Sequence, residues 1–230
     1  MSFIEVKGLK FRYPLRTNET LNIPSFEVRE KEKIFLFGPS GSGKTTFLEI
    51  LAGVLVPQSG DVFLRGENIA AMSEKQRDAF RGRNIGFIFQ NFNLIPYLNV
   101  RENIELGRHL QGRESDSVLL KKLTAKLGLT SFLEQSVSTL STGQGQRVAA
   151  ARAFYLQPSL ILADEPTSSL DYDHRERFIQ LLFSLSQDLG TTVIFVSHDR
   201  SLEKLFDRSV ALMDLNQVSP VDDRDLEVEV

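Results

Sequence analysis

The chain has 230 residues, of which 41% are hydrophobic and 25% charged, with a formal net charge of -3 and no cysteine. This composition fits one large or two small globular domains, and it excludes a disulfide framework and thiolate chemistry. The slightly acidic balance argues against a dedicated nucleic-acid binder. No stretch approaches the ~18 apolar residues of a membrane helix, and we do not expect the opening "MSFIEVKG" to be a signal peptide.

Apolar β-rich runs alternate with amphipathic helical stretches, which predicts an α/β fold with a largely parallel sheet. Residues 3–13 read as an antiparallel strand whose alternation breaks near Gly8, where we expect a bulge. Residues 173–190 have helical spacing, and Gly190 is expected to end that helix. Four runs are apolar on both faces, as in strands buried between helices: 33–38, 84–89, 159–164 and 191–197.

The stretch from about Arg101 to Thr139 is helix-rich and lacks strand patterns, which predicts a helical subdomain inserted into the sheet domain. The ending "VDDRDLEVEV" has the composition of an acidic, solvated tail. We therefore expect one domain over 1–230, with a core at about 1–90 and 158–218, a helical subdomain at about 91–157 and a tail at 221–230.

The run "GPSGSGKTT" fits the phosphate-loop pattern G-x-x-x-x-G-K-[ST] and lies between a predicted strand and a predicted helix. Glycines let successive backbone N–H groups surround a phosphate, and the helix N-terminus adds a favourable dipole. A glycine-rich turn is the alternative, but the strand and helix around the run favour phosphate binding. The predicted binding residues are Gly38, Pro39, Ser40, Gly41, Ser42, Gly43, Lys44, Thr45 and Thr46.

Two adjacent carboxylates end the apolar strand "SLILADEP". After a phosphate loop, Asp164 is expected to anchor Mg²⁺, together with the Thr45 hydroxyl. Glu165 is placed to orient and deprotonate a water that attacks the γ-phosphate. Alone, such a strand end is more often simply solvated, so this interpretation depends on the phosphate loop.

The run "STLSTGQGQR", residues 138–147, has the composition of a linker or loose surface loop, yet it leads directly into a predicted helix. Together with the phosphate loop, its "LSTGQ" resembles the signature motif of the ATP-binding cassette (ABC) ATPase family. The resemblance covers nearly the whole chain, in order. It implies the α/β P-loop NTPase fold of ABC ATPases, with a mixed core sheet, an N-terminal antiparallel β subdomain and an inserted α-helical subdomain.

The resemblance also implies roles for residues that say little when taken singly. Tyr13 in "FRYP" would stack on adenine, Gln90 at the end of "IGFIFQ" would sense Mg²⁺, and His198 at the end of "VIFVSH" would contact the γ-phosphate. Each has a plainer structural interpretation, which their shared order and spacing disfavour. The other residues implied to contact ATP are Ser141, Gly143, Gln144 and, in "SSLD", Asp171.

With the same resemblance, the implied catalytic residues are Glu165, His198 and Lys44. The implied metal ligands are Thr45, Gln90 and Asp164. The cofactors are therefore expected to be ATP and Mg²⁺.

The family resemblance further implies a head-to-tail homodimer, in which residues 138–147 cover ATP bound by the opposite subunit. The N–H groups of Gly143 and Gln144 would bind the γ-phosphate; without nucleotide they would lack a partner, which predicts an exposed and mobile segment. The family usually has glycine where this chain has Thr142. A threonine is strained there if the position needs a positive φ; otherwise its hydroxyl could add a contact.

Residues 91–104, "NFNLIPYLNVRENI", are unusually apolar for a connector, and Asn99 with Glu102 has the pattern of a helix cap. Some of these side chains are expected inside the helical subdomain. The others are expected to line a groove near residues 91–108 that receives a partner. The family resemblance implies that this partner is a short cytoplasmic helix of a membrane permease. The sequence of residues 83–104 resembles that of the bacterial lipoprotein-releasing (LolD), macrolide-exporter (MacB) and cell-division (FtsE) group. This resemblance implies mechanotransmission, in which closing of the cassettes moves a periplasmic domain.

We therefore expect an ABC transporter ATPase, cytoplasmic and peripheral on the inner membrane through its permease, without a nucleic-acid partner. One alternative is a soluble ABC ATPase acting on nucleic acid or ribosomes; the acidic charge, the lack of heptads and the single cassette argue against it. A degenerate regulatory cassette is disfavoured because Lys44, Asp164, Glu165 and His198 are all present.

Overall fold

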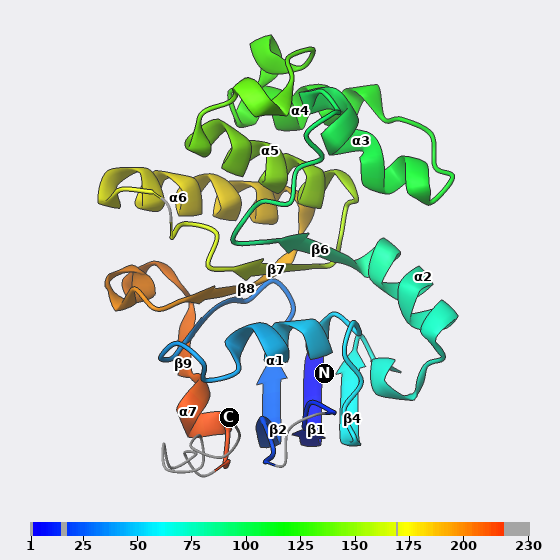
Figure 1. Cartoon of the computed structure of the whole chain (residues 1–230), viewed down its shortest axis with the longest axis vertical. Coiled ribbons are helices and arrows are strands. Elements are labelled where there is room, and N and C mark those ends of the chain that lie inside the picture. Colours follow the sequence, from blue (N-terminus) through cyan, green and yellow to red (C-terminus); the bar gives the residue numbers. More distant parts are fainter. Residues whose placement is uncertain (1, 15–17, 169, 219–230) are drawn as a thin grey trace, which may run out of the picture.

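Two β-sheets organise the computed structural model, which describes residues 2–14, 18–168 and 170–218 (Figure 1). The expected acidic tail at 221–230 lies outside these residues. Among the described residues, no helix combines the length and the hydropathy needed to cross a bilayer.

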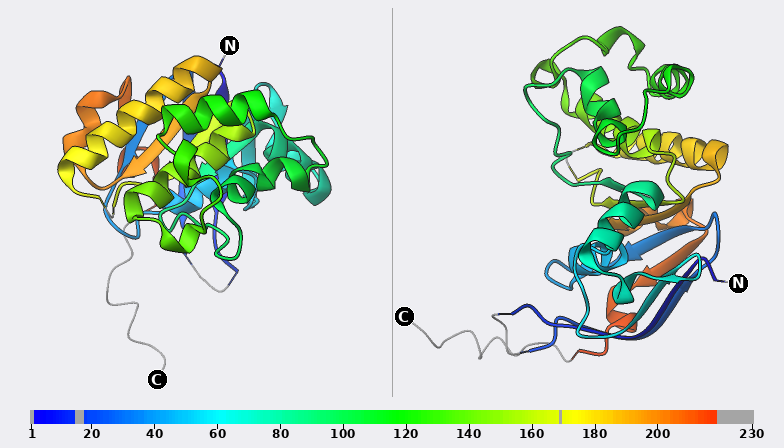
Figure 2. Two further views of the ribbon diagram at one scale, coloured as in Figure 1. Left: turned by 90° about the horizontal axis from the view of Figure 1, so that it is seen from above. Right: turned by 90° about the vertical axis from the view of Figure 1, so that its right-hand side faces the viewer.

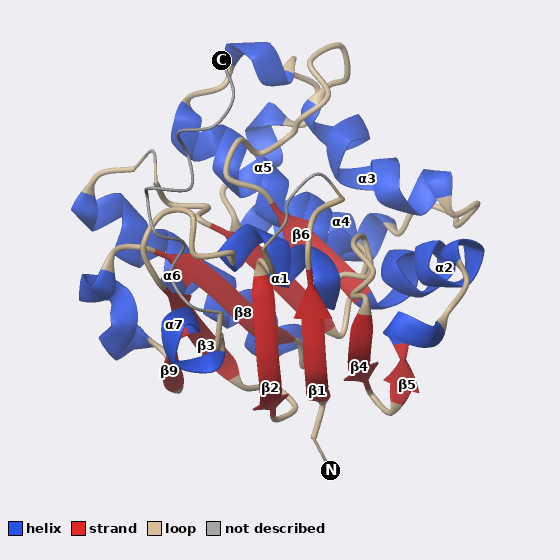
Figure 3. Ribbon diagram, turned by 60° about the horizontal axis from the view of Figure 1, so that its bottom comes forward, coloured by secondary structure: helices blue, strands red, loops and turns tan. Residues whose placement is uncertain are grey.

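The first sheet is antiparallel, with its strands side by side in Figure 3. Its order is β2 (Leu21–Val28), β1 (Ile4–Phe11), β4 (Ser59–Leu64) and β5 (Glu67–Asn68). The expected bulge is confirmed, because the β1–β4 register shifts between Lys7 and Lys10. Gly8 within the bulge has φ 57°, and Gly60 opposite has φ 90°. A Cβ on Gly60 would lie 2.4 Å from the Gly8 carbonyl oxygen, so only glycine fits there.

The second sheet is parallel throughout its described pairings. Its order is β6 (Ile85–Ile88), β7 (Leu160–Asp164), β8 (Thr192–Ser197), β3 (Lys33–Phe37) and β9 (Arg208–Ala211). The four strands predicted from buried apolar runs are thus confirmed. Successive residues of a strand face opposite sides of a sheet, and here both sides are buried. In β3, Ile34 and Leu36 join one hydrophobic cluster while Phe35 joins the other.

Helices cover both faces of the parallel sheet. In Figure 1, α1 lies between the two sheets, and α5 and α6 lie on the opposite face of the parallel sheet beneath α3 and α4; Figure 2 shows the same layers from the side. The helices are α1 (Lys44–Leu51), α2 (Glu74–Asn84), α3 (Val100–Leu110), α4 (Ser117–Lys126), α5 (Thr142–Tyr155), α6 (Tyr172–Leu189) and α7 (Leu212–Leu215). Within the described residues there are also four 3-10 turns, at Ile69–Ala71, Thr130–Phe132, Val137–Thr139 and Arg200–Leu205.

The helix boundaries follow local signals. Gly190 ends α6 in the left-handed conformation, as predicted. Asn99 and Glu102 form the predicted capping box at the start of α3.

Helix α5 lies directly on β6 because Gly86 has no side chain. A Cβ on Gly86 would come within 2.7 Å of the Ala153 carbonyl oxygen. The second half of α5 is consequently buried at Ala149, Ala150, Ala151, Ala153, Phe154 and Tyr155.

Candidate active site

The carboxyl ends of four neighbouring strands bring the predicted site residues to one edge of the parallel sheet. The phosphate loop follows β3, Asp164 closes β7, and His198 follows β8. Gln90 is exposed in the turn that follows β6. Parallel strands all end at the same edge, so residues far apart in sequence meet there, and ligands of open α/β sheets bind there as well.

The loop before α1 has the geometry of an anion cradle. Gly41 and Gly43 have φ 78° and 94°, and a Cβ on Gly43 would lie 2.9 Å from the Leu21 side chain. No side chain caps α1, whereas each of α2 to α6 has a side-chain cap. The hydroxyl of Ser42 is buried and has no hydrogen-bond partner among the described residues. Uncapped N–H groups and an unsatisfied hydroxyl fit a phosphate group.

Lys44 lies over this loop and is only 7% exposed. Its ammonium donates to the carbonyl oxygens of Gly38 (2.9 Å) and Pro39 (2.8 Å). Its Nζ lies 3.8 Å from Oε1 of Glu165. The loop carbonyls thus hold a cation at the centre of the site, within ion-pair distance of the predicted base.

The Thr45 hydroxyl donates to Oδ2 of Asp164 at 2.8 Å, so the two predicted metal anchors are in contact. Burial raises the pKa of Asp164, and the charge of Glu165 raises it further; the Thr45 hydrogen bond and Lys44 act in the opposite direction. A hydroxyl and a carboxylate are hard oxygen ligands that fit Mg²⁺. Within the described residues, no group of three or more His, Asp or Glu side chains could form a closed metal cage. Such a pair suits Mg²⁺, which takes most of its ligands from phosphate and water.

Glu165 and His198 form the second contact of the site. His198 Nδ1 lies 2.9 Å from Oε2 of Glu165. Glu165 has φ 43°, an uncommon conformation for this residue type, and its N–H donates to the carbonyl oxygen of Val196 on β8. The neighbouring strand therefore imposes this backbone, which presents the carboxylate to both Lys44 and His198.

Tyr13 and Asp171 lie at separate places around the site. The Tyr13 ring packs edge-on against Phe11, and its hydroxyl is 3.0 Å from the Thr46 hydroxyl, beside the phosphate loop. Asp171 caps α6 by accepting from the N–H of His174, and its carboxylate also lies 2.6 Å from the His174 ring.

Residues 141–144 form the N-terminus of α5, on the face of the sheet opposite α1. Ser141 and Thr142 are exposed, as predicted. The expectation that the Gln144 N–H lacks a partner is wrong: it donates to the Ser141 hydroxyl at 3.3 Å, and the Ser141 N–H donates to the Gln144 side chain at 2.8 Å. This reciprocal cap satisfies the N–H groups of Ser141 and Gln144 within the chain.

Thr142 is the first residue of α5 and does not have a positive φ, so the strain interpretation is excluded. Within the described residues, no hydrogen bond or ion pair joins residues 141–144 to the phosphate loop. The fold thus keeps these two predicted parts of the site apart within one chain.

One connection was missed from the sequence. Arg175 on α6 donates to the Leu170 carbonyl oxygen (2.7 Å) and to the Asp199 carboxylate (2.8 Å). It thereby links the segment before Asp171 to the segment after His198. The position of Asp199 immediately after His198 is the only signal in the sequence that points to it.

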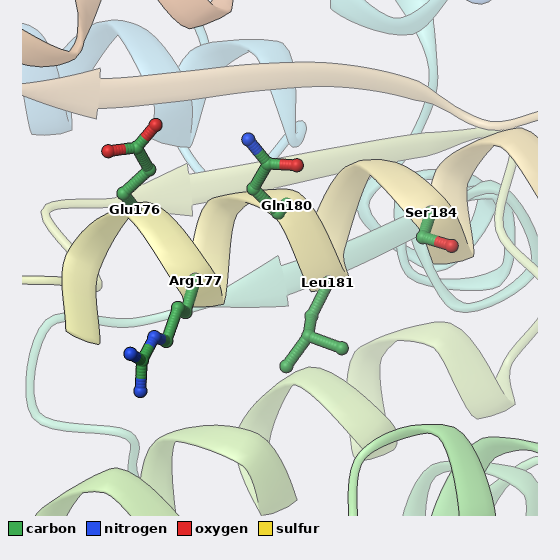
Figure 4. Close-up of a pocket in the computed structure, with 5 residues that line it drawn as sticks. All are labelled: Glu176, Arg177, Gln180, Leu181 and Ser184. Atoms are coloured by element: carbon green, nitrogen blue, oxygen red, sulfur yellow. The ribbon is translucent and has the colours of Figure 1, made fainter. Parts of the chain in front are cut away.

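A pocket of about 760 Å³ lies elsewhere, along α6 (Figure 4). In Figure 4, Glu176 and Gln180 point to one side of the helix and Arg177 and Leu181 to the other. The lining residues, which also include Ser184, come from this single helix, and none belongs to the predicted site. We therefore place the chemistry at the sheet edge.

Comparisons with known proteins agree with this geometry. Residues 21–168 match the family model described as ABC transporter. The chain is 44% identical over 188 residues to an uncharacterized ABC transporter ATP-binding protein, YbbA, of Escherichia coli K12, covering 81% of this chain and 82% of YbbA. It is 40% identical over 190 residues to the lipoprotein-releasing system ATP-binding protein LolD of Bacteroides thetaiotaomicron, covering 82% of this chain and 87% of LolD.

A solved structure has the same fold. The ATP-binding cassette MJ0796, in a dimeric post-hydrolysis state bound to ADP and Pi, superimposes with a TM-score of 0.80 at 32% identity. The similarity covers 90% of this chain and 93% of that cassette.

Proposed function

The chain belongs to the ABC transporter family as an ATP-binding, ATP-hydrolysing cassette, and we propose that it closes as a head-to-tail homodimer around two MgATP to drive a separate membrane permease. The observation that carries this proposal is the meeting of Lys44, the Thr45–Asp164 pair and the Glu165–His198 pair at one sheet edge, beside an uncapped helix.

In the proposed mechanism, the loop N–H groups and Lys44 hold the phosphates, while Tyr13 packs against the base. Thr45, Asp164 and Gln90 would hold Mg²⁺, and this cation would neutralise charge on the phosphates. Glu165 accepts the proton of the attacking water. His198 lies 2.9 Å from Glu165 and orients that carboxylate and the γ-phosphate. Lys44 stabilises the charge that develops on the transferred group.

A second copy of the chain completes each site in this proposal. Ser141, Gly143 and Gln144 stand at the exposed end of α5, on the opposite face of the sheet from their own phosphate loop. A helix N-terminus at the surface suits the phosphates of a nucleotide held by another subunit, and Asp171 at the start of α6 is proposed to contact the same nucleotide. The similar cassette MJ0796 is dimeric, which supports this arrangement.

The permease is proposed to dock on the helical subdomain, residues 91–157, near residues 91–108. Tyr97 is 85% exposed there. Asn103 is fully buried and makes four hydrogen bonds to the backbone of Ile95, Leu98 and Asn99. An apolar ring is thus presented by an ordered segment, as a docking surface requires.

The similarity to LolD supports a permease of the mechanotransmission type, in which the cassette dimer moves an extracytoplasmic domain. The cassette would then lie on the cytoplasmic face of the inner membrane, held there by the permease.

The first test is Glu165→Gln in the purified chain. We expect ATP binding to persist, a stable dimer to form with MgATP, and turnover to fall ~10²-fold or more, the usual scale for a lost general base. Glu176→Gln, on the α6 surface, is the matched control and should hydrolyse ATP normally. Near-normal hydrolysis by Glu165→Gln would remove Glu165 from the proposed role.

The partner is tested by co-purification from detergent-solubilised membranes with a tagged Glu165→Gln chain and MgATP. Recovery of a few-helix permease with a large extracytoplasmic domain supports mechanotransmission. A channel-type permease with many membrane helices contradicts that type but keeps a transporter. Recovery of ribosomes or nucleic acid without a permease contradicts the proposal that the chain drives a transporter.

A further inference from the structure

The turn after Gln90 has an unusual backbone. Phe92 and Asn93 are consecutive non-glycine residues with φ 58° and 47°. Positive φ is uncommon for a bulky residue such as phenylalanine, and it persists only where the surroundings impose it. The turn is tight, since the Asn93 N–H donates to the Asn91 carbonyl oxygen at 2.6 Å and the Phe92 N–H to that of Phe89 at 3.1 Å.

Arg152 on α5 is the side chain that holds this turn. Its Nη2 donates to the Phe92 carbonyl oxygen at 2.5 Å and its Nη1 to the Asn93 carbonyl oxygen at 2.6 Å. Burial lowers the pKa of Arg152, so this cation depends on the two carbonyl groups for compensation. Within the described residues, no carboxylate pairs with it.

A second contact joins the same turn to the same face of α5. Gly145 precedes Arg152 by two helical turns, and a Cβ on Gly145 would lie 3.4 Å from the Phe92 ring. The bare backbone at Gly145 lets the ring lie against the helix. The turn is therefore fixed to α5 at two points, through the Phe92 ring and through the two carbonyl groups.

We infer that Arg152 is a positioning residue that fixes Gln90 relative to α5, the helix whose N-terminus carries Ser141. Gln90 lies only two residues before the first clamped carbonyl. The inference rests on the proposed function, in which Gln90 contacts the Mg²⁺ bound with the nucleotide. It adds a link between the position of α5 and that contact.

The Arg152 guanidinium holds the turn through its shape as well as its charge. Its planar fork offers two N–H groups to two successive carbonyl oxygens, whereas lysine offers a single mobile ammonium. Lysine at this position should therefore hold one carbonyl and restore only part of the function.

The experiment compares Arg152→Met and Arg152→Lys with wild type, with Arg101→Met as the matched control. Arg101 belongs to the same helical region but pairs with Glu134 on the surface. The first readout is hydrogen exchange of residues 89–95 in the nucleotide-free chain. We expect about tenfold faster exchange in Arg152→Met, an intermediate value in Arg152→Lys and no change in Arg101→Met.

The second readout is the Mg²⁺ concentration for half-maximal ATP hydrolysis, measured beside Gln90→Ala. We expect Arg152→Met to shift it in the same direction as Gln90→Ala while ATP binding without metal stays unchanged. Gly145→Leu, which keeps Arg152 but displaces the Phe92 ring, should reproduce both effects and serves if Arg152→Met does not fold.

Unchanged exchange at residues 89–95 in Arg152→Met would overturn the inference. Faster exchange over the whole chain, equal in Arg152→Met and Arg152→Lys, would also overturn it, because the role would then be merely structural. If Gln90→Ala shifts the Mg²⁺ concentration for half-maximal hydrolysis and Arg152→Met does not, the proposed role of Arg152 is contradicted while that of Gln90 is kept. No shift in Gln90→Ala contradicts the proposed role of Gln90 itself, and with it the inference that Arg152 positions it.

Discussion

The pKa values of Asp164 and Glu49 depend on the balance between burial and neighbouring charge. Asp164 is buried, and this raises its pKa, while the Thr45 hydroxyl and Lys44 favour its ionised form. Its carboxylate also raises the pKa of Glu49 on α1, after the larger effect of burial. The site thus contains more negative charge than Lys44 alone compensates, which suits a bound cation.

Lys44→Met tests the cation of this balance. The change removes a charge-assisted contact to phosphate, and we expect ATP affinity to fall by about ten- to a hundredfold. Equilibrium titration with a fluorescent ATP analogue measures it, with the exposed Lys75→Met as control. Equal affinities of the two variants would place the phosphates elsewhere.

Asp199→Asn tests the link beside His198. The Ser201 hydroxyl, the Ser201 N–H and Arg175 all lower the pKa of Asp199, so its ionised form stabilises the folded chain above the ordinary pKa of 3.8. That contribution is lost as pH falls through the lowered pKa. We expect the variant to be less stable by about 0.5–1 kcal/mol at pH 7, since solvent screens part of the pairing. Urea unfolding should show the difference shrinking as pH falls below 3.8; a constant difference would contradict this origin.

At the scale of elements, the bulge in β1 depends on two glycines that differ in how much room each leaves for a Cβ atom. Gly60→Ala combines a positive φ with a contact of 2.4 Å to the Gly8 carbonyl oxygen, whereas Gly8→Ala meets no atom within 4 Å. We expect losses of about 2–3 kcal/mol for Gly60→Ala and about 1 kcal/mol for Gly8→Ala in thermal or urea unfolding. Equal losses would show that backbone strain alone matters.

Thr142→Gly tests the N-terminus of α5. Its side chain is exposed at the start of the helix, and glycine would loosen the first turn. We expect ATP-driven dimerisation to weaken by about two- to fivefold, since a glycine in a helix costs up to about 1 kcal/mol. ATP binding by the monomer should be unchanged. Altered nucleotide affinity with unaltered dimerisation, measured by light scattering and titration, contradicts the role of this residue across the dimer.

The elements show where the sequence is informative. The buried strands, the end of α6 at Gly190 and the cap at Asn99 follow from apolar runs and turn chemistry, and the structure confirms them. Helix α2 was not predicted because its sequence is polar on nearly all sides, with only Phe80 buried. The cap by Ser141 and Gln144 was missed because the polar run was assigned to nucleotide rather than to its own helix.

The meeting of Lys44, Asp164 and His198 at one sheet edge was predictable because their motifs follow parallel strands. Contacts to backbone carbonyl groups were not predictable. Arg152 binds the carbonyl oxygen of Phe92, and Arg175 binds that of Leu170; every residue has such an oxygen, so no sequence pattern marks these two contacts.

At the scale of the whole molecule, the parallel sheet separates two hydrophobic clusters and also the two groups of predicted ATP contacts. The phosphate loop and α1 belong to the face shared with the antiparallel sheet, and α5 belongs to the other face. Each chain therefore carries two separate surfaces that are predicted to contact nucleotide, and the proposed head-to-tail pair would use both at once.

Tyr97→Ser tests the proposed permease surface, with Leu110→Ser as control because Leu110 is similarly exposed, at 79%, on α3. We expect Tyr97→Ser to lower recovery of the permease by about tenfold, the usual scale for a buried aromatic anchor, while ATP hydrolysis by the isolated chain stays normal. Pull-down from solubilised membranes measures it. Equal recovery with the two variants contradicts docking at Tyr97.

The absence of a side chain at Gly86 has a mechanical consequence. The close contact between Gly86 and Ala153 would make the buried end of α5 the pivot of any tilt of this helix. Ser141, at the other end of α5, lies about 18 Å from that pivot, at 1.5 Å per residue. A tilt of about 10° at the pivot would displace Ser141 by about 3 Å, roughly the length of one hydrogen bond. Distances between spin labels on α5 and β6, with and without nucleotide, would measure this displacement. A larger side chain at Gly86 should shift this pivot, and so change the displacement of Ser141 rather than the residues that carry out ATP hydrolysis.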